Sequence, residues 1–290
     1  MFAEEWPLMM FTLFSQLAIG TYIMLFFIRW MLAKENTSLA NQLTQSGLML
    51  TGPVMAVALI FSLFHLGTPL GAVRSILNLG SSWLSREILT AGGFMVFWFV
   101  SYLAFHKGKA GKGLGLLTCL IGLAAIFSMA SIYSSSIRPA WTGLNTYIAF
   151  YGATFALGNA GALTLVSLAA RGKAGEQAHK ILRTVLLVLG VGIVVPLLYL
   201  PVFIGGLSSG IPAAQASAQL LSGTYLVPLV IRALLSLAGL VLLFLGLKKQ
   251  ASFSLNQVLP ALVLVLAGEF IGRYVFYGAA VSIFTGHTLI

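Results

Sequence analysis

The chain has 290 residues, of which 59 % are hydrophobic and only 8 % are charged, and its net charge is +10. Soluble domains carry roughly 25 % charged residues, so this composition excludes a soluble globular protein and indicates an integral membrane protein. The basic excess lies mainly in loops between apolar runs, where it predicts membrane topology and not nucleic-acid binding.

Eight apolar runs are long enough to cross a membrane, which takes roughly twenty residues. Because lipid offers no hydrogen-bond partner to an open backbone, continuous runs of this length predict α-helices. We therefore expect an all-α integral membrane protein, one membrane domain over residues 1–290 with roughly two four-helix bundles. Glu4 and Glu5 precede the first run, which argues against a cleavable signal peptide. The expected spans are residues 8–30, 45–66, 87–106, 114–135, 146–170, 184–206, 224–246 and 258–280.

The lysines and arginines between the spans predict the orientation, because cytoplasmic loops carry an excess of them. Only Arg74, Arg86 and Arg138 lie in the even connections, and the two chain tails hold none. The odd connections are therefore expected to be cytoplasmic, with both termini outside (N-out and C-out). The odd connections hold eleven basic residues: Arg29, Lys34, Lys107, Lys109, Lys112, Arg171, Lys173, Lys180, Arg183, Lys248 and Lys249.

The first group of candidate site residues lies where the second span ends and the third begins. His65 ends the second span, and Arg86 and Glu87 open the third, with Ser85 as the expected N-cap that places Glu87 in the first turn. A histidine and a carboxylate at one depth suit a quinol, whose two hydroxyls need proton acceptors as two electrons leave. A structural interpretation stays open, in which His65 and Glu87 only cap their helices and Arg86 meets lipid phosphate.

The second group comprises Arg232 on the seventh span and Glu269 and Arg273 on the eighth. Glu269 precedes Arg273 by four residues, the favourable order for an ion pair on one helix. At 1.5 Å per residue, Arg232 and Glu269 each lie roughly 12–14 Å below the outer boundary, so the two side chains are expected to meet. They form either a structural ion pair or part of a proton route.

Haem is not expected, because a bis-histidine site needs two histidines that face each other inside the bundle. His65 and His287 lie on the outer side, and His106 and His179 lie on the cytoplasmic side. With one cysteine, Cys119, the sequence has no ligand set for an iron–sulfur cluster, and we expect no metal site. A partner protein would have to receive any electrons.

Four short motifs occur in order along the eight-span chain: Glu5-Trp6-Pro7-Leu8, Phe64-His65-Leu66-Gly67-Thr68-Pro69, Ser82-Trp83-Leu84-Ser85-Arg86-Glu87 and Gly268-Glu269-Phe270-Ile271-Gly272-Arg273 with Phe276-Tyr277. Together they resemble the membrane-anchor subunits of dimethyl sulfoxide reductases, in the wider group of polysulfide-reductase-like quinone anchors. The resemblance implies a haem-free anchor in the bacterial inner membrane that oxidises menaquinol near the periplasmic face. It implies electron transfer to an iron–sulfur subunit and then to a periplasmic molybdopterin catalytic subunit. The quinol-site role falls on His65 and Glu87, with Ser85 and Arg86 as lesser candidates.

Two other functions are compatible with the residues. A proton-coupled secondary transporter would use Arg232 and Glu269 as its coupling pair, although no matched pair of broken spans is evident. A purely structural tether would carry no quinone chemistry. The uncharged outer loop 207–223 is expected either to pack on a partner or to form a mobile cap.

Overall fold

The structure is a computed structural model that describes residues 2–65, 78–106, 111–170, 176–249 and 254–283. Side chains within these ranges are described except at residues 2–4, 65, 106, 176–179 and 248–249. The described part is all-helical, as predicted. Its helices are α1 (Phe2–Leu32), α2 (Thr37–His65), α4 (Trp83–His106), α5 (Lys112–Ser134), α6 (Leu144–Ala170), α7 (Glu176–Ser208), α8 (Pro212–Ser222), α9 (Leu226–Lys249) and α10 (Leu255–Gly278).

All eight predicted spans are confirmed as helices long and apolar enough to cross a membrane. Several begin earlier than hydropathy predicts, because polar caps lie outside the apolar run. The Asn36 side chain accepts a hydrogen bond from the backbone N–H of Leu39, so α2 begins at Thr37. Ser254 and Gln257 form a capping box at the start of α10.

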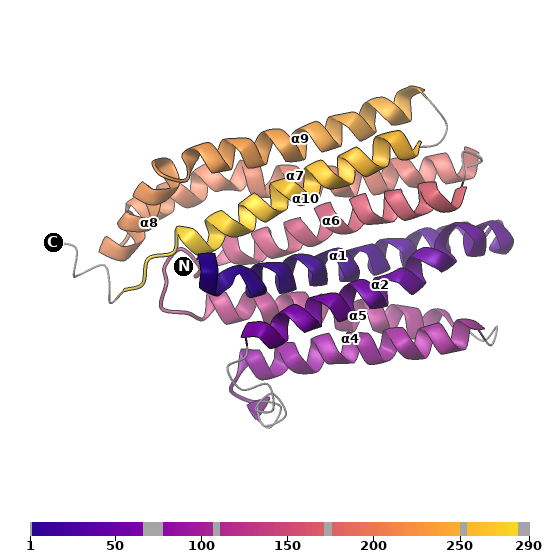
Figure 1. Cartoon of the computed structure of the whole chain (residues 1–290), viewed down its shortest axis with the longest axis horizontal. Coiled ribbons are helices and arrows are strands. Elements are labelled where there is room, and N and C mark those ends of the chain that lie inside the picture. Colours follow the sequence, from indigo (N-terminus) through magenta and orange to yellow (C-terminus); the bar gives the residue numbers. More distant parts are fainter. Residues whose placement is uncertain (1, 66–77, 107–110, 171–175, 250–253, 284–290) are drawn as a thin grey trace.

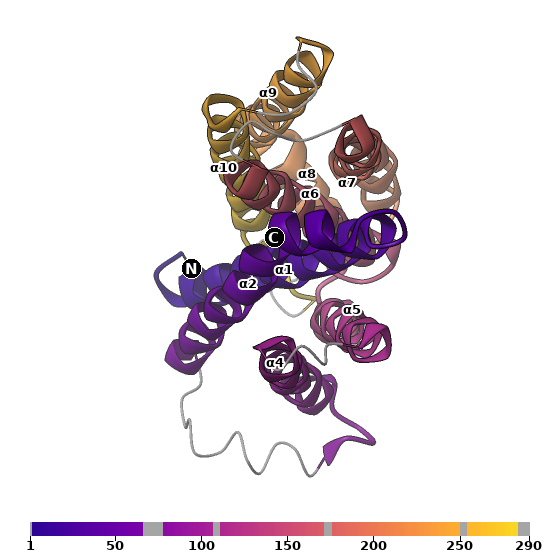
Figure 2. The same ribbon diagram turned by 90° about the vertical axis from the view of Figure 1, so that its right-hand side faces the viewer.

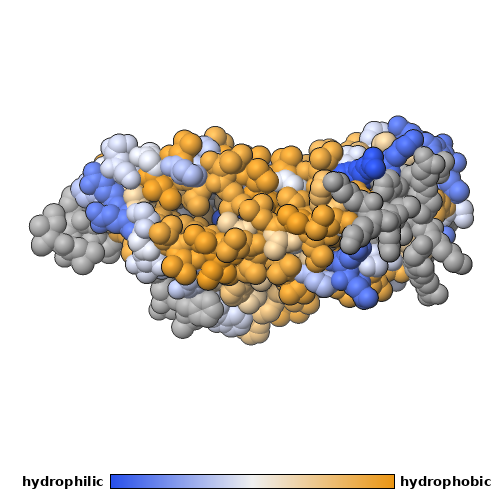
Figure 3. Space-filling model, turned by 90° about the horizontal axis from the view of Figure 1, so that it is seen from above, coloured by the Kyte–Doolittle hydropathy of each residue, from blue (hydrophilic) through white to orange (hydrophobic). Residues whose placement is uncertain are grey.

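The eight long helices run side by side, so the molecule has two ends (Figure 1). One end, which we call the basic end, is where α1, α4, α6 and α9 finish and where α2, α5, α7 and α10 begin. The other end, where α1 begins and α10 finishes, we call the terminal end. An apolar band covers the face between them, as a bilayer requires (Figure 3). The side of the membrane that each end faces stays a prediction.

The helices form two groups of four, as predicted, with α1 joining them. Figure 2 shows α4 and α5 on one side of the α1–α2 pair, and α6, α7, α9 and α10 on the other. The α1 helix packs on α2 and α5 in its own group and extensively on α6 in the second group. As a result, α1 and α6 are the most deeply buried spans.

Glycines bring α1 and α6 into backbone contact. A Cβ atom on Gly158 of α6 would lie 2.3 Å from the carbonyl carbon of Gly20 on α1. The Thr21 hydroxyl donates to the Gly158 carbonyl across this contact, at 3.3 Å. Gly158 therefore permits a close approach of the two helices, as small residues commonly do in membranes.

We expect Gly158→Ala to destabilise the protein by about 1–3 kcal/mol, the usual cost of overpacking, because two backbones must move apart. Gly190→Ala is the matched control, since its new Cβ would meet only the Leu240 methyl groups at 3.7–3.8 Å. The measurement is the melting temperature of the detergent-purified protein. Equal melting temperatures for the two variants would contradict a tight α1–α6 contact.

The uncharged segment after α7 is helical and packed, which hydropathy alone does not indicate. Pro212 opens the short helix α8, and the buried side of α8 includes Ala214 and Leu221. The Ser217 hydroxyl accepts a hydrogen bond from the backbone N–H of Val281, at 3.1 Å. The segment therefore closes part of the terminal end by packing against the residues after α10.

Candidate functional site

The start of α4 positions Glu87 deeper than expected. The Ser82 hydroxyl accepts a hydrogen bond from the backbone N–H of Ser85 at 3.3 Å, and α4 begins at Trp83. The expectation that Ser85 is the N-cap is wrong, because the polar cap lies three residues earlier. No acidic residue lies in the first turn of α4, so Glu87 occupies the second turn and gains less from the helix dipole.

Glu87 is a buried carboxyl group, only 8 % exposed, at the terminal end of the bundle. Among the described side chains it forms no ion pair with a lysine or arginine. One turn earlier, the Trp83 ring meets the edge of Phe127 on α5, with 5.6 Å between ring centroids. The Glu87 carboxyl group is therefore buried one helical turn from an aromatic pair formed by Trp83 and Phe127.

Arg86 and Ser85 lie in the first turn of α4, next to Glu87. The Arg86 guanidinium donates to the carbonyls of Leu79 and Gly80, both at 2.8 Å, and lies 4.1 Å from the centroid of the Trp83 ring. Ser85 is buried, at 1 % exposure. Arg86 thereby ties the connection that precedes α4 to the helix itself.

His65 is the last residue of α2, but its side chain lies outside the described residues, as does the connection 66–77. The backbone places the end of α2 at the same end of the bundle as the start of α4 (Figure 1). The shared depth expected for His65 and Glu87 is consistent with this placement, while their contact stays a prediction.

A cluster of five aromatic residues lies at the terminal end, between the two groups of candidate site residues that the sequence predicts. We call Tyr133, Trp141, Phe150, Phe276 and Tyr277 the aromatic cluster. The hydroxyls of Tyr133 and Tyr277 share a hydrogen bond of 2.5 Å. Trp141 stacks on Phe276, with 5.5 Å between centroids, and donates to the Phe276 carbonyl at 2.7 Å. The ring of Phe150 lies 5.5 Å from that of Tyr133.

The two tyrosines of the aromatic cluster lie within electrostatic range of both Glu87 and Arg273. Glu87 on α4 interacts electrostatically with both Tyr133 and Tyr277. Arg273 on α10 interacts electrostatically with the same two tyrosines. Two groups that are far apart in sequence thus act on one buried pair of hydroxyls.

Arg273 faces α1 and α6. Its guanidinium donates to the Gln16 side-chain oxygen at 2.9 Å and lies 3.9 Å from the centroid of the Phe150 ring. The Gln16 amide in turn donates to the Phe150 carbonyl at 3.2 Å. The expected ion pair between Glu269 and Arg273 is not formed among the described residues, because the Arg273 guanidinium contacts Gln16 and Phe150 instead.

Arg232 and Glu269 do meet, as the spacing predicts. The Arg232 guanidinium donates to the Glu269 carboxylate at 3.4 Å, and both side chains are largely buried. A Cβ atom on Gly272 would lie 2.5 Å from Nε of Arg232, so this glycine makes room for the guanidinium. A cavity of about 60 Å³ adjoins the pair and is also lined by Arg273 and Phe276.

The sequence-based prediction finds the charged residues and misses the uncharged ones that join them. Gln16, Tyr133 and Tyr277 are buried polar residues within spans, and buried polar groups require partners. That rule marks Gln16 as unusual in an apolar run, but it does not identify its partner. The tyrosines give no such signal, because tyrosine is common near span ends.

Comparison of the sequence with known proteins identifies a matching family. The family model for the DMSO reductase anchor subunit (DmsC) matches residues 1–279. The sequence is 28 % identical over 285 residues to the anaerobic dimethyl sulfoxide reductase chain YnfH of Escherichia coli K12, a match that spans 97 % of this protein and 96 % of that one. A second anaerobic dimethyl sulfoxide reductase protein of Escherichia coli K12 matches with the same identity and coverage. An anaerobic dimethyl sulfoxide reductase protein of Haemophilus influenzae is 28 % identical over 153 residues, about half of each sequence.

Proposed function

Because the chain belongs to the family of DMSO reductase anchor subunits, we propose that it oxidises menaquinol at the terminal end of α2 and α4. It is a multi-pass protein of the bacterial inner membrane and the anchor of an oxidoreductase complex. The electrons pass to an iron–sulfur subunit and then to a molybdopterin subunit on the periplasmic side, most directly for reduction of dimethyl sulfoxide. Glu87 carries this proposal, as a buried carboxyl group one turn into α4, near Tyr133 and Tyr277.

The proposed reaction removes two electrons and two protons from menaquinol and leaves menaquinone. Glu87 accepts one proton and His65 the other, and both protons leave toward the terminal end. In this proposal the naphthoquinol ring packs against the aromatic pair of Trp83 and Phe127. Arg86 positions this pair by holding the carbonyls that precede α4 and by stacking on Trp83.

A proton-coupled transporter remains the alternative function for Arg232 and Glu269, whose buried ion pair favours it. Transporters of this kind commonly bind their substrates at interrupted helices. Here α2, α7 and α10 are continuous through Pro53, Pro196 and Pro260. Because these helices are not interrupted, the architecture favours the quinol function over the transporter.

Purification of the tagged protein from cells grown anaerobically on dimethyl sulfoxide tests the proposal. We expect it to bring partner subunits that contain iron and molybdenum, measured by elemental analysis. The purified complex should reduce dimethyl sulfoxide with a reduced naphthoquinone as the donor. A protein that purifies alone, without iron or molybdenum, would instead support the transporter.

A further inference from the structure

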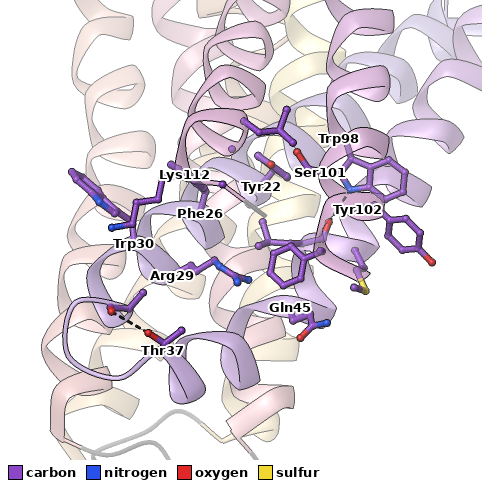
Figure 4. A pocket seen from close by; sticks show the side chains of 17 residues that line it. Tyr22, Phe26, Arg29, Trp30, Thr37, Gln45, Trp98, Ser101, Tyr102 and Lys112 are labelled. Carbon is purple, nitrogen blue, oxygen red and sulfur yellow. Dashed lines mark hydrogen bonds between the residues drawn. The ribbon is translucent and has the colours of Figure 1, made fainter. Parts of the chain in front are cut away.

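A cavity at the basic end lies far from the proposed quinol site. Its volume is about 300 Å³, and it lies between α1, α2, α4 and α5 (Figure 4). Its walls are mainly apolar and aromatic, with Phe26 and Trp30 from α1 and Trp98 and Tyr102 from α4. Cavities of this size and composition typically bind the apolar part of a small molecule.

Arg29 gives the cavity an incompletely satisfied cation. Its Nη2 atom donates to the Asn41 side-chain oxygen at 2.5 Å, and the guanidinium lies 3.8 Å from the centroid of the Phe105 ring. Its Nη1 atom is buried and has no hydrogen-bond partner among the described residues. Figure 4 shows the Arg29 side chain extending into the space toward Gln45. A buried donor of a charged group without a partner is costly, so the arrangement favours an anion here.

The first turn of α5 adds positive potential at the same cavity. Gly111, Lys112 and Leu114 line the cavity, and α5 begins at Lys112. The N-cap, Gly111, has no side chain that could accept a hydrogen bond from the first N–H groups of this 23-residue helix. The dipole of α5 and the Lys112 ammonium therefore both favour an anionic group near Arg29.

We propose that this cavity binds an anionic glycerophospholipid. The phosphate diester binds at Arg29, Lys112 and the first turn of α5, and an acyl chain lies along the aromatic walls. Charge and depth both support this ligand, because basic pockets between spans at the membrane boundary recognise acidic headgroups. Phosphate oxygens also suit the planar guanidinium donors of arginine.

The lining argues against a second site of quinol oxidation. Among the described residues around the cavity there is no acidic side chain and no histidine, so it offers no carboxylate or imidazole to accept a proton. The hydroxyls of Tyr22 and Ser101 and the amide of Gln45 are suited to a polar headgroup. The proposed lipid binding therefore does not depend on the quinol function.

Native mass spectrometry of the detergent-purified complex, with phosphatidylglycerol or phosphatidylcholine of the same acyl lengths added, tests the proposal. We expect phosphatidylglycerol to bind at least tenfold more tightly. Arg29→Gln should weaken phosphatidylglycerol binding by about tenfold, the effect of losing one charge-assisted hydrogen bond. It should weaken phosphatidylcholine binding by a smaller factor, because the choline cation of that lipid already opposes binding beside Arg29 and Lys112. The matched control is Arg183→Gln, which removes an exposed arginine on α7 outside the cavity.

Lys112→Gln keeps the test decisive if Arg29→Gln does not fold, because Lys112 is exposed at the helix start. Wild-type binding in each cavity variant that folds would overturn the proposal. Equal binding of the two lipids would also overturn it, as would an effect of Arg183→Gln as large as that of the cavity variants. A competition arm with inorganic phosphate separates the sources of the anion. Complete displacement of the lipid by free phosphate would assign the site to a soluble anion.

Discussion

Glu87→Gln is expected to lower menaquinol-dependent turnover by about 100-fold or more, because a positioned general base contributes roughly 10²–10⁴-fold. The amide keeps the size of the carboxyl group, so the packing around residue 87 is retained, but it accepts no proton at neutral pH. Turnover is measured with a reduced naphthoquinone as the donor and dimethyl sulfoxide as the acceptor. A parallel assay with reduced viologen, which donates electrons without quinol chemistry, reports whether the complex is assembled and active.

The control for Glu87→Gln is Glu35→Gln, which removes an exposed carboxylate at the basic end. His65→Ala is expected to reduce quinol turnover in the same way as Glu87→Gln, with the viologen activity retained. Normal quinol turnover in both site variants, with intact assembly, would reject the assigned proton acceptors and favour a structural tether. Equal loss of the quinol and viologen activities would mean that the variants disturb assembly and not proton transfer.

Glu269→Gln is expected to destabilise the protein by about 3–5 kcal/mol, because it leaves the Arg232 guanidinium buried without its anionic partner. Arg232→Gln should cost a similar amount for the converse reason. The double variant Arg232→Gln/Glu269→Gln should recover most of the lost stability, since no unpaired charge remains. Melting temperatures of the four proteins in detergent measure the cycle.

The same four proteins separate the two roles left open for this pair. A structural ion pair predicts that the double variant regains both stability and quinol turnover. A proton route predicts a stable double variant that still lacks turnover, because neither amide takes up or releases a proton at neutral pH. Additive losses of stability in the double variant would contradict the contact between Arg232 and Glu269.

The spans could be predicted from sequence because the bilayer imposes one physical requirement along each of them. A long apolar run must be helical in lipid, so all eight helices follow from hydropathy. Helix starts follow different rules. Hydropathy begins the third span at Glu87, whereas the Ser82 side chain caps a helix that begins at Trp83. This difference of one turn moves Glu87 away from the helix end.

The candidate site was predictable only in its charged members. The contact between Arg232 and Glu269 follows from depth, because antiparallel neighbours at one depth can meet. The hydrogen bond between Arg273 and Gln16 joins residues 257 positions apart, and no local spacing indicates it. The Tyr133–Tyr277 hydrogen bond likewise depends on how α5 and α10 are brought together.

The central position of α1 has a consequence for how the protein is made. It is the first of the eight spans to leave the ribosome. Gln16 on this helix has two hydrogen-bond partners that are made much later: Phe150 follows it by 134 residues and Arg273 by 257 residues. Until α6 and α10 insert, the Gln16 amide is without these contacts in a lipid environment that supplies no replacement. A product truncated before Arg273 therefore lacks the contact that satisfies the Gln16 side-chain oxygen on its first helix.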